Sequence, residues 1–236
     1  MDGTVILLHG LGRTSRSMAR LERHIAAAGW ETRNVDYESR RVSVRDAAES
    51  VSTQLGDLRV EQPLIAVTHS LGGIILRALR SRFNWQGCAM MAPPNHGSEM
   101  ASWTSGIAPI RWLMGPALIE LGSEPSWPSP PKPCGIIVGT AKATLDNPPS
   151  WLGWIRGVFD QDEVHDGTVS LREAVHAGAT DVAMVEASHT RIMDHADTVA
   201  LVLKFLETGG FGTAGMDPAE VEMRSVADAI GIAGDG

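Results

Sequence analysis

The sequence has few of the residues that several protein classes require. Only two cysteines, Cys88 and Cys134, occur in 236 residues, which excludes a disulfide framework. Each begins an apolar run, so we expect two buried thiols. Lys and Arg total 20 against 28 Asp and Glu, a formal net charge of -8. Because the phosphates of nucleic acids attract clustered Lys and Arg, this balance argues against a nucleic-acid partner.

Long apolar runs and cofactor motifs are also missing. No run approaches the roughly 18 apolar residues of a membrane span, so we expect no transmembrane segment. The chain opens on a strand-like run, with no charged and apolar leader, which favours the cytoplasm, although a mature secreted form would look the same. No spacing of His, Cys, Asp and Glu suggests a metal site, and no Gly-x-Gly-x-x-Gly precedes a helix. We therefore expect neither a metal nor a cofactor.

What the chain does contain is an alternation of strand-like and helix-like segments. Its length fits one large domain or two small ones, and we expect one. Apolar runs predict strands at 4–8, 32–36, 64–68, 88–91, 135–139 and 182–185. Helical periodicity predicts helices over 15–28, 44–58 and about 195–207, and another that begins near residue 70. Such alternation is typical of an α/β fold with a mainly parallel sheet.

Several residues mark the predicted helix ends. Ser43 is a candidate N-cap for the second helix, and Asp194 is one for the last. The last helix is expected to stop at Gly209. The segment from 211 to 236 is small, acidic and Gly-bearing, so we expect a loosely attached tail after a domain that covers residues 1–210.

Two further segments break the alternation. Residues 98–133 contain Trp103, Trp112 and Met114 together with seven of the thirteen prolines. This composition is too apolar for a linker and too rich in proline for an ordinary crossover helix. Residues 146–160 have the same character.

A lone serine separates the third strand from the helix that follows it, in the stretch LIAVTHSLGGIILRALR. A tight strand-turn-helix corner turns such a serine outward and aims the first helix amides at the same point. Gly72 and Gly73 would let the helix start pack closely against the strands. The motif THSLG corresponds to Gly-x-Ser-x-Gly with Thr68 in place of the first glycine, so a branched residue must fit beside Ser70.

With these motifs in order, the chain resembles the α/β-hydrolase superfamily from about Val5 to Phe211. The closer likeness is to its lipase and esterase branch, which is related to bacterial triacylglycerol lipases and GPI-inositol deacylase-like proteins. Four stretches carry the likeness. The loop that supplies one oxyanion amide matches VILLHGLGRT, and the turn that leads into a lid matches APPNHGSEMA. The loop that bears the acid matches HDGTVSL, and the loop that bears the base matches ASHTRIM. The resemblance implies an α/β-hydrolase fold with a mainly parallel sheet flanked by helices and a lid insertion at 98–133.

The resemblance also assigns roles to individual residues. Ser70 would be the nucleophile, Asp166 the acid and His189 the base, while the backbone amides of Leu11 and Leu71 would form the oxyanion hole. Four residues remain as competitors: His195 for the base, and Asp160, Asp162 and Glu163 for the acid. His9 and His69 adjoin these groups and are interpreted as loop-shaping residues.

The implied activity is hydrolysis of apolar acyl esters through an acyl-enzyme, with a small-molecule ester as the substrate. Trp103, Trp112 and Met114 are the candidate substrate-binding residues, because a Trp- and Met-rich lid would line an acyl pocket. The same segment could be an accessory subdomain with tryptophan in its core. Arg13 could contact a polar head group or brace its loop, and we favour the brace. An acyltransferase using the same acyl-enzyme, or a non-catalytic binding protein on a hydrolase scaffold, remains the alternative function.

Overall fold

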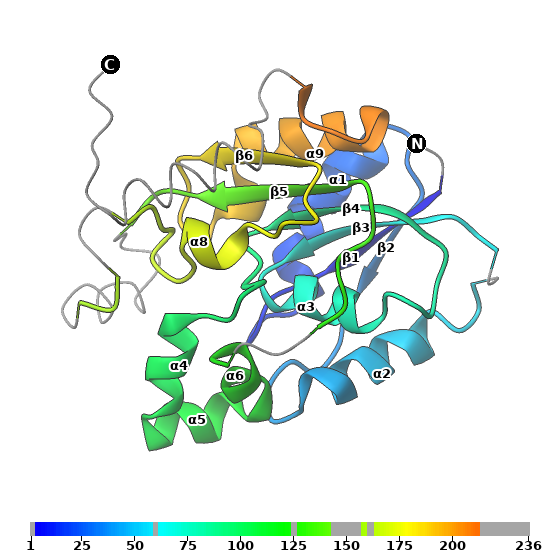
Figure 1. Ribbon diagram of the computed structural model, residues 1–236. Helices are drawn as coiled ribbons and strands as arrows, with labels where there is room; N and C mark the ends of the chain where they lie inside the picture. The colour runs from blue at the N-terminus through cyan, green and yellow to red at the C-terminus, as the bar shows by residue number, and fades with distance from the viewer. Residues whose placement is uncertain (1–2, 59–60, 124–126, 143–156, 160–162, 213–236) are drawn as a thin grey trace, which may run out of the picture.

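A six-stranded sheet forms the centre of the computed structural model, which describes residues 3–58, 61–123, 127–142, 157–159 and 163–212 (Figure 1). The strands run in the order β2-β1-β3-β4-β5-β6, and each neighbouring pair is parallel. This arrangement confirms the parallel sheet predicted from the sequence. Its strands are β1 (Thr4–Leu8), β2 (Thr32–Val35), β3 (Leu64–His69), β4 (Trp85–Met91), β5 (Cys134–Gly139) and β6 (Asp181–Val185).

The central strands are buried on both faces, which explains why they appear in the sequence as continuous apolar runs. Every residue of β1, β3 and β5 is buried. β4 begins at Trp85, three residues before the predicted start at Cys88. The exposed Gln86 and the following Gly87 interrupt the apolar run, so the sequence pattern does not indicate the first three residues of the strand. Cys88 and Cys134 are register partners on β4 and β5, both buried and unlinked, as the sequence predicts.

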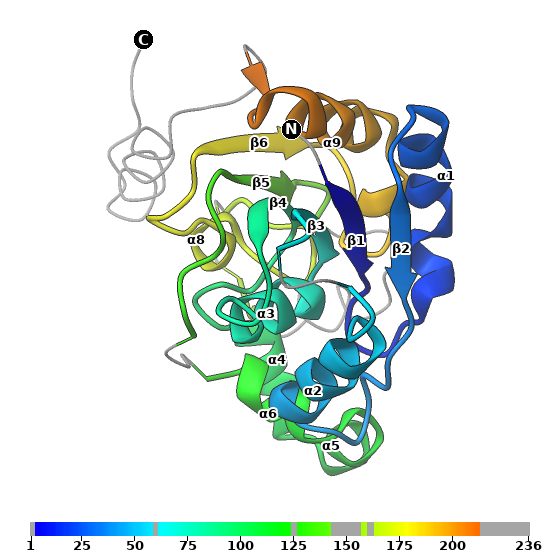
Figure 2. The ribbon, with the colours of Figure 1, turned by 90° about the vertical axis from the view of Figure 1, so that its right-hand side faces the viewer.

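Helices cover both faces of the sheet (Figure 2). One face is covered by α1 (Ala19–Ala27), preceded by the 3₁₀ turn η1 (Ser15–Met18), and by α9 (Ala196–Thr208). The other face is covered by α2 (Val44–Gln54) and α3 (Leu71–Ala78). The short helix α8 (Leu171–Ala174) and the 3₁₀ turn η2 (Ile192–Asp194) lie in the connections near β6. Two apolar cores result, one on each side of the sheet.

The predicted helices are present, with three corrections at their ends. The first turn of the predicted 15–28 helix is the 3₁₀ helix η1, a common form at a helix start. α2 ends at Gln54 instead of residue 58, because Leu55 leaves helical geometry just before Gly56. Ser43 caps α2 as predicted, and its hydroxyl accepts the Asp46 N–H. The cap of α9 is His195, because Asp194 is already part of η2.

The Trp-, Met- and Pro-rich segment forms three short helices. They are α4 (Glu99–Ser105), α5 (Ala108–Met114) and α6 (Pro116–Leu121), and they lie together beside α2 and α3 (Figures 1 and 2). Pro109 and Pro116 sit in the first turns of α5 and α6, where a missing N–H costs no hydrogen bond. We call α4 to α6 the lid helices. No single crossover helix forms here, in agreement with the proline content.

Part of the sequence predictions lies outside the described residues. This holds for most of the 146–160 segment and for the tail beyond residue 212. Phe211, predicted to begin the tail, is buried against Phe205, and its backbone N–H donates a hydrogen bond to the Asp181 carboxylate. Among the described residues, no helix is long and apolar enough to cross a membrane.

Candidate active site

Ser70 occupies a strained corner between β3 and α3. Its backbone has φ 52° and ψ -120°, a conformation that non-glycine residues rarely adopt. The Ser70 N–H donates to the Met91 carbonyl at 2.9 Å, which holds the corner against β4. A Cβ on Gly72 would lie 2.4 Å from the Leu8 carbonyl oxygen, so only glycine lets α3 start this close to β1. The predicted tight corner is therefore present, with the serine at its tip.

Thr68, which replaces the first glycine of the motif, is accommodated next to Gly73. The side chain is fully buried. A Cβ on Gly73 would lie 3.4 Å from the Thr68 hydroxyl oxygen and 2.6 Å from the Met90 methyl group. Gly73 therefore leaves the space that the Met90 side chain fills, and the Thr68 hydroxyl lies at an ordinary van der Waals distance from the same position.

Three side chains far apart in the sequence meet at the carboxyl edge of the sheet. His189 Nε2 lies 3.0 Å from Ser70 Oγ, and His189 Nδ1 lies 2.7 Å from Asp166 Oδ2. All three residues are buried, Asp166 completely. This serine–histidine–carboxylate chain has the hydrogen-bonding geometry that activates a serine hydroxyl as a nucleophile.

The loops after β5 and β6 position Asp166 and His189. Asp166 packs at the end of β5, since a Cβ on Gly139 would lie 2.7 Å from the Asp166 Cβ. Asp166 Oδ1 accepts the N–H groups of Thr168 and Val169. The His189 N–H donates to the Asp166 carbonyl at 3.0 Å. The two loops are therefore joined by backbone as well as by side chains.

The competing residues lie elsewhere or outside the described part of the chain. Asp160 and Asp162 are outside the described residues. Glu163 faces Arg172 at 3.5 Å. His195 sits at the start of α9, where its Nδ1 accepts the Asp197 N–H. Among the described competitors, neither Glu163 nor His195 contacts Ser70.

The loop after β1 approaches the serine closely. A Cβ on Gly10 would lie 3.3 Å from Ser70 Cβ and 2.7 Å from His69 Nδ1, so a glycine is required there. The next residue is Leu11, and neither its N–H nor that of Leu71 donates a hydrogen bond to another described residue. Both amides therefore remain able to donate to an oxyanion formed at Ser70.

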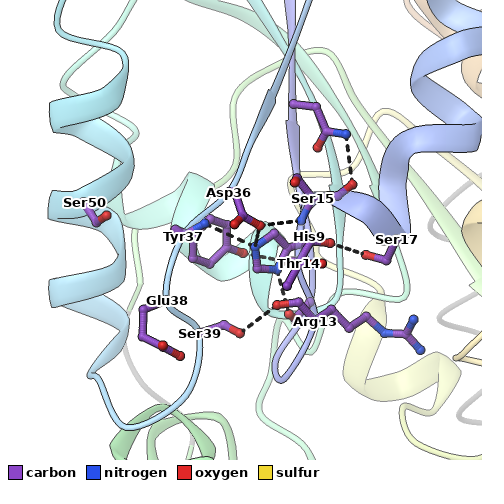
Figure 3. A network of polar contacts seen from close by, with 12 residues as sticks. His9, Arg13, Thr14, Ser15, Ser17, Asp36, Tyr37, Glu38, Ser39 and Ser50 are labelled. Carbon is purple, nitrogen blue, oxygen red and sulfur yellow. Dashed lines mark hydrogen bonds and ion pairs between the residues drawn. The ribbon is translucent and has the colours of Figure 1, made fainter.

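A polar cluster supports this loop (Figure 3). The His9 ring stacks on Tyr37 with 4.0 Å between centroids, and the Tyr37 hydroxyl donates to the His9 carbonyl. Ser39 Oγ accepts the Gly12 N–H at 3.0 Å. Burial lowers the pKa of His9 and raises the pKa of Tyr37 well above its usual value. Both rings are therefore neutral near pH 7, and they fit the loop-shaping role that the sequence suggests for His9.

His69 contacts His189 from the other side. Its Nε2–H donates to the His189 carbonyl at 3.0 Å, and the two rings lie 4.8 Å apart. Complete burial, together with the adjacent His189, lowers the pKa of His69 well below its ordinary value. A neutral His69 places no positive charge beside His189, so an imidazolium can form on His189 without that repulsion.

An apolar pocket of about 620 Å³ opens over Ser70 and His189. The lid helices supply one wall, and the loops that carry Leu11, Arg13 and Val169 supply much of the rest. The wall residues from the lid helices are Met100, Ala101, Thr104, Ile110, Leu113, Met114, Leu118 and Leu121. Such a wall suits an uncharged hydrocarbon chain.

Of the three predicted substrate-binding residues, only Met114 lines this pocket. Trp112 is 71% exposed on the outside of α5, where the Arg41 guanidinium lies 4.9 Å from its ring centroid. Trp112 follows Ile110 by two positions and so faces about 200° away from it. Trp103 precedes the pocket residue Thr104 and is also not part of the wall. Within each helix the spacing could have identified the inward face, because Ile110 and Met114 lie four residues apart on α5 and Leu118 and Leu121 three residues apart on α6.

Comparisons with known proteins rest on the fold. No protein-family model matches the chain, and no curated protein matches its sequence. The mature lipase BlEst2 of Bacillus licheniformis superposes with a TM-score of 0.70 at 17% identity, over 89% of this chain and 92% of that one. The chain has the α/β-hydrolase fold. A Thermogutta terrifontis esterase shares this α/β-hydrolase fold with a TM-score of 0.55 at 10% identity, over 88% and 90% of the two chains.

A third α/β-hydrolase match is the pyrethroid hydrolase PytH, with a TM-score of 0.56 at 15% identity over 89% of this chain and 99% of that one. The structural neighbours are thus esterases and lipases, and at this identity the likeness concerns the fold. Among the described residues, no group of three or more His, Cys, Asp or Glu side chains could hold a metal ion.

Proposed function

We propose that the protein is a serine-dependent carboxylic ester hydrolase that acts on apolar acyl esters. The observation that carries this proposal is the continuous hydrogen-bonded chain from Ser70 Oγ through His189 to Asp166, at 3.0 and 2.7 Å. The apolar pocket above Ser70 supports an acyl substrate. The esterase and lipase folds among its structural neighbours agree with the same reaction class.

In the proposed mechanism, His189 removes the Ser70 proton as the hydroxyl oxygen attacks the ester carbonyl. The Leu11 and Leu71 amides donate to the oxyanion, and Asp166 holds the imidazole with its proton on Nδ1. The His189 imidazolium then protonates the departing alkoxide, which leaves an acyl group on Ser70. Water activated by His189 attacks this acyl-enzyme and releases the carboxylic acid.

The acyl group would enter the pocket formed by the lid helices. Each buried methylene is worth about 0.8 kcal/mol, or roughly fourfold in kcat/KM. We therefore expect kcat/KM to rise with acyl length from acetate until the pocket of about 620 Å³ is filled. Charged acyl groups should be poor substrates, since the lid-helix part of this wall carries no charged side chain that could pair with them.

Hydrolysis of p-nitrophenyl esters of graded chain length tests the proposal. His189→Ala should remove nearly all turnover, whereas the matched variant His195→Ala should retain it. A fluorophosphonate probe should label Ser70 in the wild type and leave the Ser70→Ala variant unlabelled. If folded protein neither hydrolyses any ester nor reacts with the probe, the binding-protein alternative replaces this proposal. Adding an alcohol to the same assay measures how the acyl-enzyme partitions between water and transfer.

A further inference from the structure

A second hollow of about 330 Å³ lies next to the acyl pocket and is lined by arginines. We call it the basic hollow. Five arginines line it, and Asp194 is the one carboxylate among its described lining residues. The arginines are Arg13, Arg16, Arg20, Arg23 and Arg191. In a chain with a formal net charge of -8, this is a local excess of positive charge.

Three of these arginines form a stripe on one side of η1 and α1. Arg16, Arg20 and Arg23 follow one another at spacings of four and three residues, which places them on one helical face. Like charges at this spacing repel one another and destabilise a helix. None of the three forms an ion pair with a described residue, whereas Arg33, Arg82 and Arg172 do. The stripe is therefore a repulsive arrangement that a bound anion would relieve.

The basic hollow lies on the leaving-group side of the proposed active site. Arg13 and Thr190 line both the basic hollow and the acyl pocket, and Thr190 directly follows His189. In the proposed mechanism His189 protonates the departing alkoxide, so the alcohol portion of an ester must lie beside it. The acyl pocket thus adjoins the acyl side of the ester bond, and the basic hollow adjoins its alcohol side.

Arg13 connects the two spaces. Its Nη2 donates to the Thr190 carbonyl at 3.3 Å, as the predicted brace requires. Its side chain leads away from the His9 and Tyr37 cluster (Figure 3). The remaining arginines around the hollow come from η1, α1 and the residue after Thr190. Guanidinium groups match phosphate oxygens in geometry and charge, and several of them can share one phosphate.

We propose that the basic hollow binds a phosphate group carried by the alcohol portion of the ester, so that the preferred substrates are acyl esters of phosphorylated alcohols. This inference rests on the proposed ester hydrolase function and narrows its substrate class. The acyl chain would fill the lid pocket while the phosphate lies among Arg16, Arg20 and Arg23. The apolar acyl pocket and the charged hollow then recognise opposite ends of one molecule.

The kinetic test compares octanoylglycerol phosphate with octanoylglycerol below their critical micelle concentrations. Wild-type kcat/KM should be higher for the phosphorylated ester, and the difference should shrink as salt is added. In the variant Arg16→Gln/Arg20→Gln/Arg23→Gln, the ratio of the two kcat/KM values should fall roughly tenfold. The matched variant Arg45→Gln/Arg80→Gln/Arg82→Gln removes three arginines that do not line the hollow, and should keep the wild-type ratio.

Two kinetic outcomes overturn the inference while the hydrolase proposal stands. One is an equal rate for both esters at every salt concentration. The other is a preference for the phosphorylated ester that appears only above the critical micelle concentration, which would assign the arginines to a lipid surface.

Binding to the Ser70→Ala variant tests the hollow even if no ester is hydrolysed. Calorimetric titration should show tighter binding of octanoylglycerol phosphate than of octanoylglycerol, and the added Arg16, Arg20 and Arg23 substitutions should abolish the difference. Equal affinities for the two ligands would refute the phosphate site. If the wild type hydrolyses neither ester while Ser70→Ala still binds the phosphorylated ester more tightly, the hydrolase proposal alone is refuted.

Discussion

Asp166 uses its two carboxylate oxygens for different partners. Oδ1 accepts two backbone N–H groups, from Thr168 and Val169, and Oδ2 faces His189 Nδ1. The two N–H groups fix the orientation of the carboxylate, and this orientation turns Oδ2 toward the imidazole. The proposed base thus receives a defined tautomer, with its proton on Nδ1 and its lone pair on Nε2 toward Ser70.

We predict that Asp166→Asn lowers kcat on the order of 10⁴-fold without unfolding the protein. The Asn carbonyl would take the position of Oδ1, because two N–H groups point there. Its amide nitrogen would then face His189 Nδ1 and stabilise the tautomer that cannot accept the Ser70 proton. Steady-state kinetics with a p-nitrophenyl ester and an unfolding curve check this. Activity within tenfold of wild type would contradict the assignment of Asp166.

Ser70 carries backbone strain at the corner between β3 and α3. With φ 52° and ψ -120°, it holds a conformation that costs a non-glycine residue on the order of 1–3 kcal/mol. We predict that Ser70→Gly raises the free energy of unfolding by about 1 kcal/mol relative to Ser70→Ala. Urea denaturation of the two variants measures this difference. Equal stabilities would show that the corner relaxes around alanine.

At the scale of elements, α5 separates an inner from an outer face. Met114 lines the acyl pocket, and Trp112 lies outside against Arg41. We predict that Met114→Trp shortens the preferred acyl chain, because the larger ring would displace about two methylenes of an octanoyl chain from the pocket. Burial of two methylenes is worth about 1.6 kcal/mol. The kcat/KM for an octanoyl ester should therefore fall roughly tenfold relative to a butyryl ester. Trp112→Ala should leave the chain-length profile unchanged. A shifted profile in Trp112→Ala would place the acyl chain elsewhere.

The sequence predicts some elements better than others for physical reasons. β1, β3 and β5 are buried on both faces, so their apolar runs are unbroken and their positions follow from composition. The start of β4 was missed because Gln86 is exposed within the strand. The apolar composition of the lid segment identified a pocket wall. It could not identify which face of each short helix turns inward, and the most conspicuous aromatic, Trp112, faces outward.

The site residues were predictable in a different way. The order of the motifs named Ser70, Asp166 and His189, and these are the side chains that the fold brings together. The basic hollow was not foreseen. Its arginines come from the β1 loop, α1 and the loop after β6, and only folding places these separate segments around one space.

At the scale of the whole molecule, Glu173 links the lid to the acid loop. Its carboxylate accepts the Glu99 N–H at the start of α4 and the Ser170 N–H at the start of α8. Burial raises the pKa of the Glu173 carboxyl from its ordinary value of 4.5 to about 7. The folded protein therefore keeps a proton on Glu173 between these pH values, where the unfolded chain has lost it.

We predict a pH-dependent stability from this group. Its contribution is fully present below pH 4.5 and is lost as the pH rises toward about 7, by on the order of 3 kcal/mol. Glu173→Gln should flatten the fall in unfolding free energy across this window, as measured by urea denaturation at several pH values. The exposed Glu61→Gln serves as the control. An unchanged slope in Glu173→Gln would rule out Glu173 as its source.

The lid helices form one uninterrupted insertion between β4 and β5, while Ser70, Asp166 and His189 all lie on other stretches of the chain. Recombination could therefore replace the entire insertion in a single event, provided that the new segment again offers Glu173 the backbone N–H that Glu99 supplies. Such an exchange would alter the wall of the pocket and leave Ser70, Asp166, His189 and the arginines near the N-terminus unchanged.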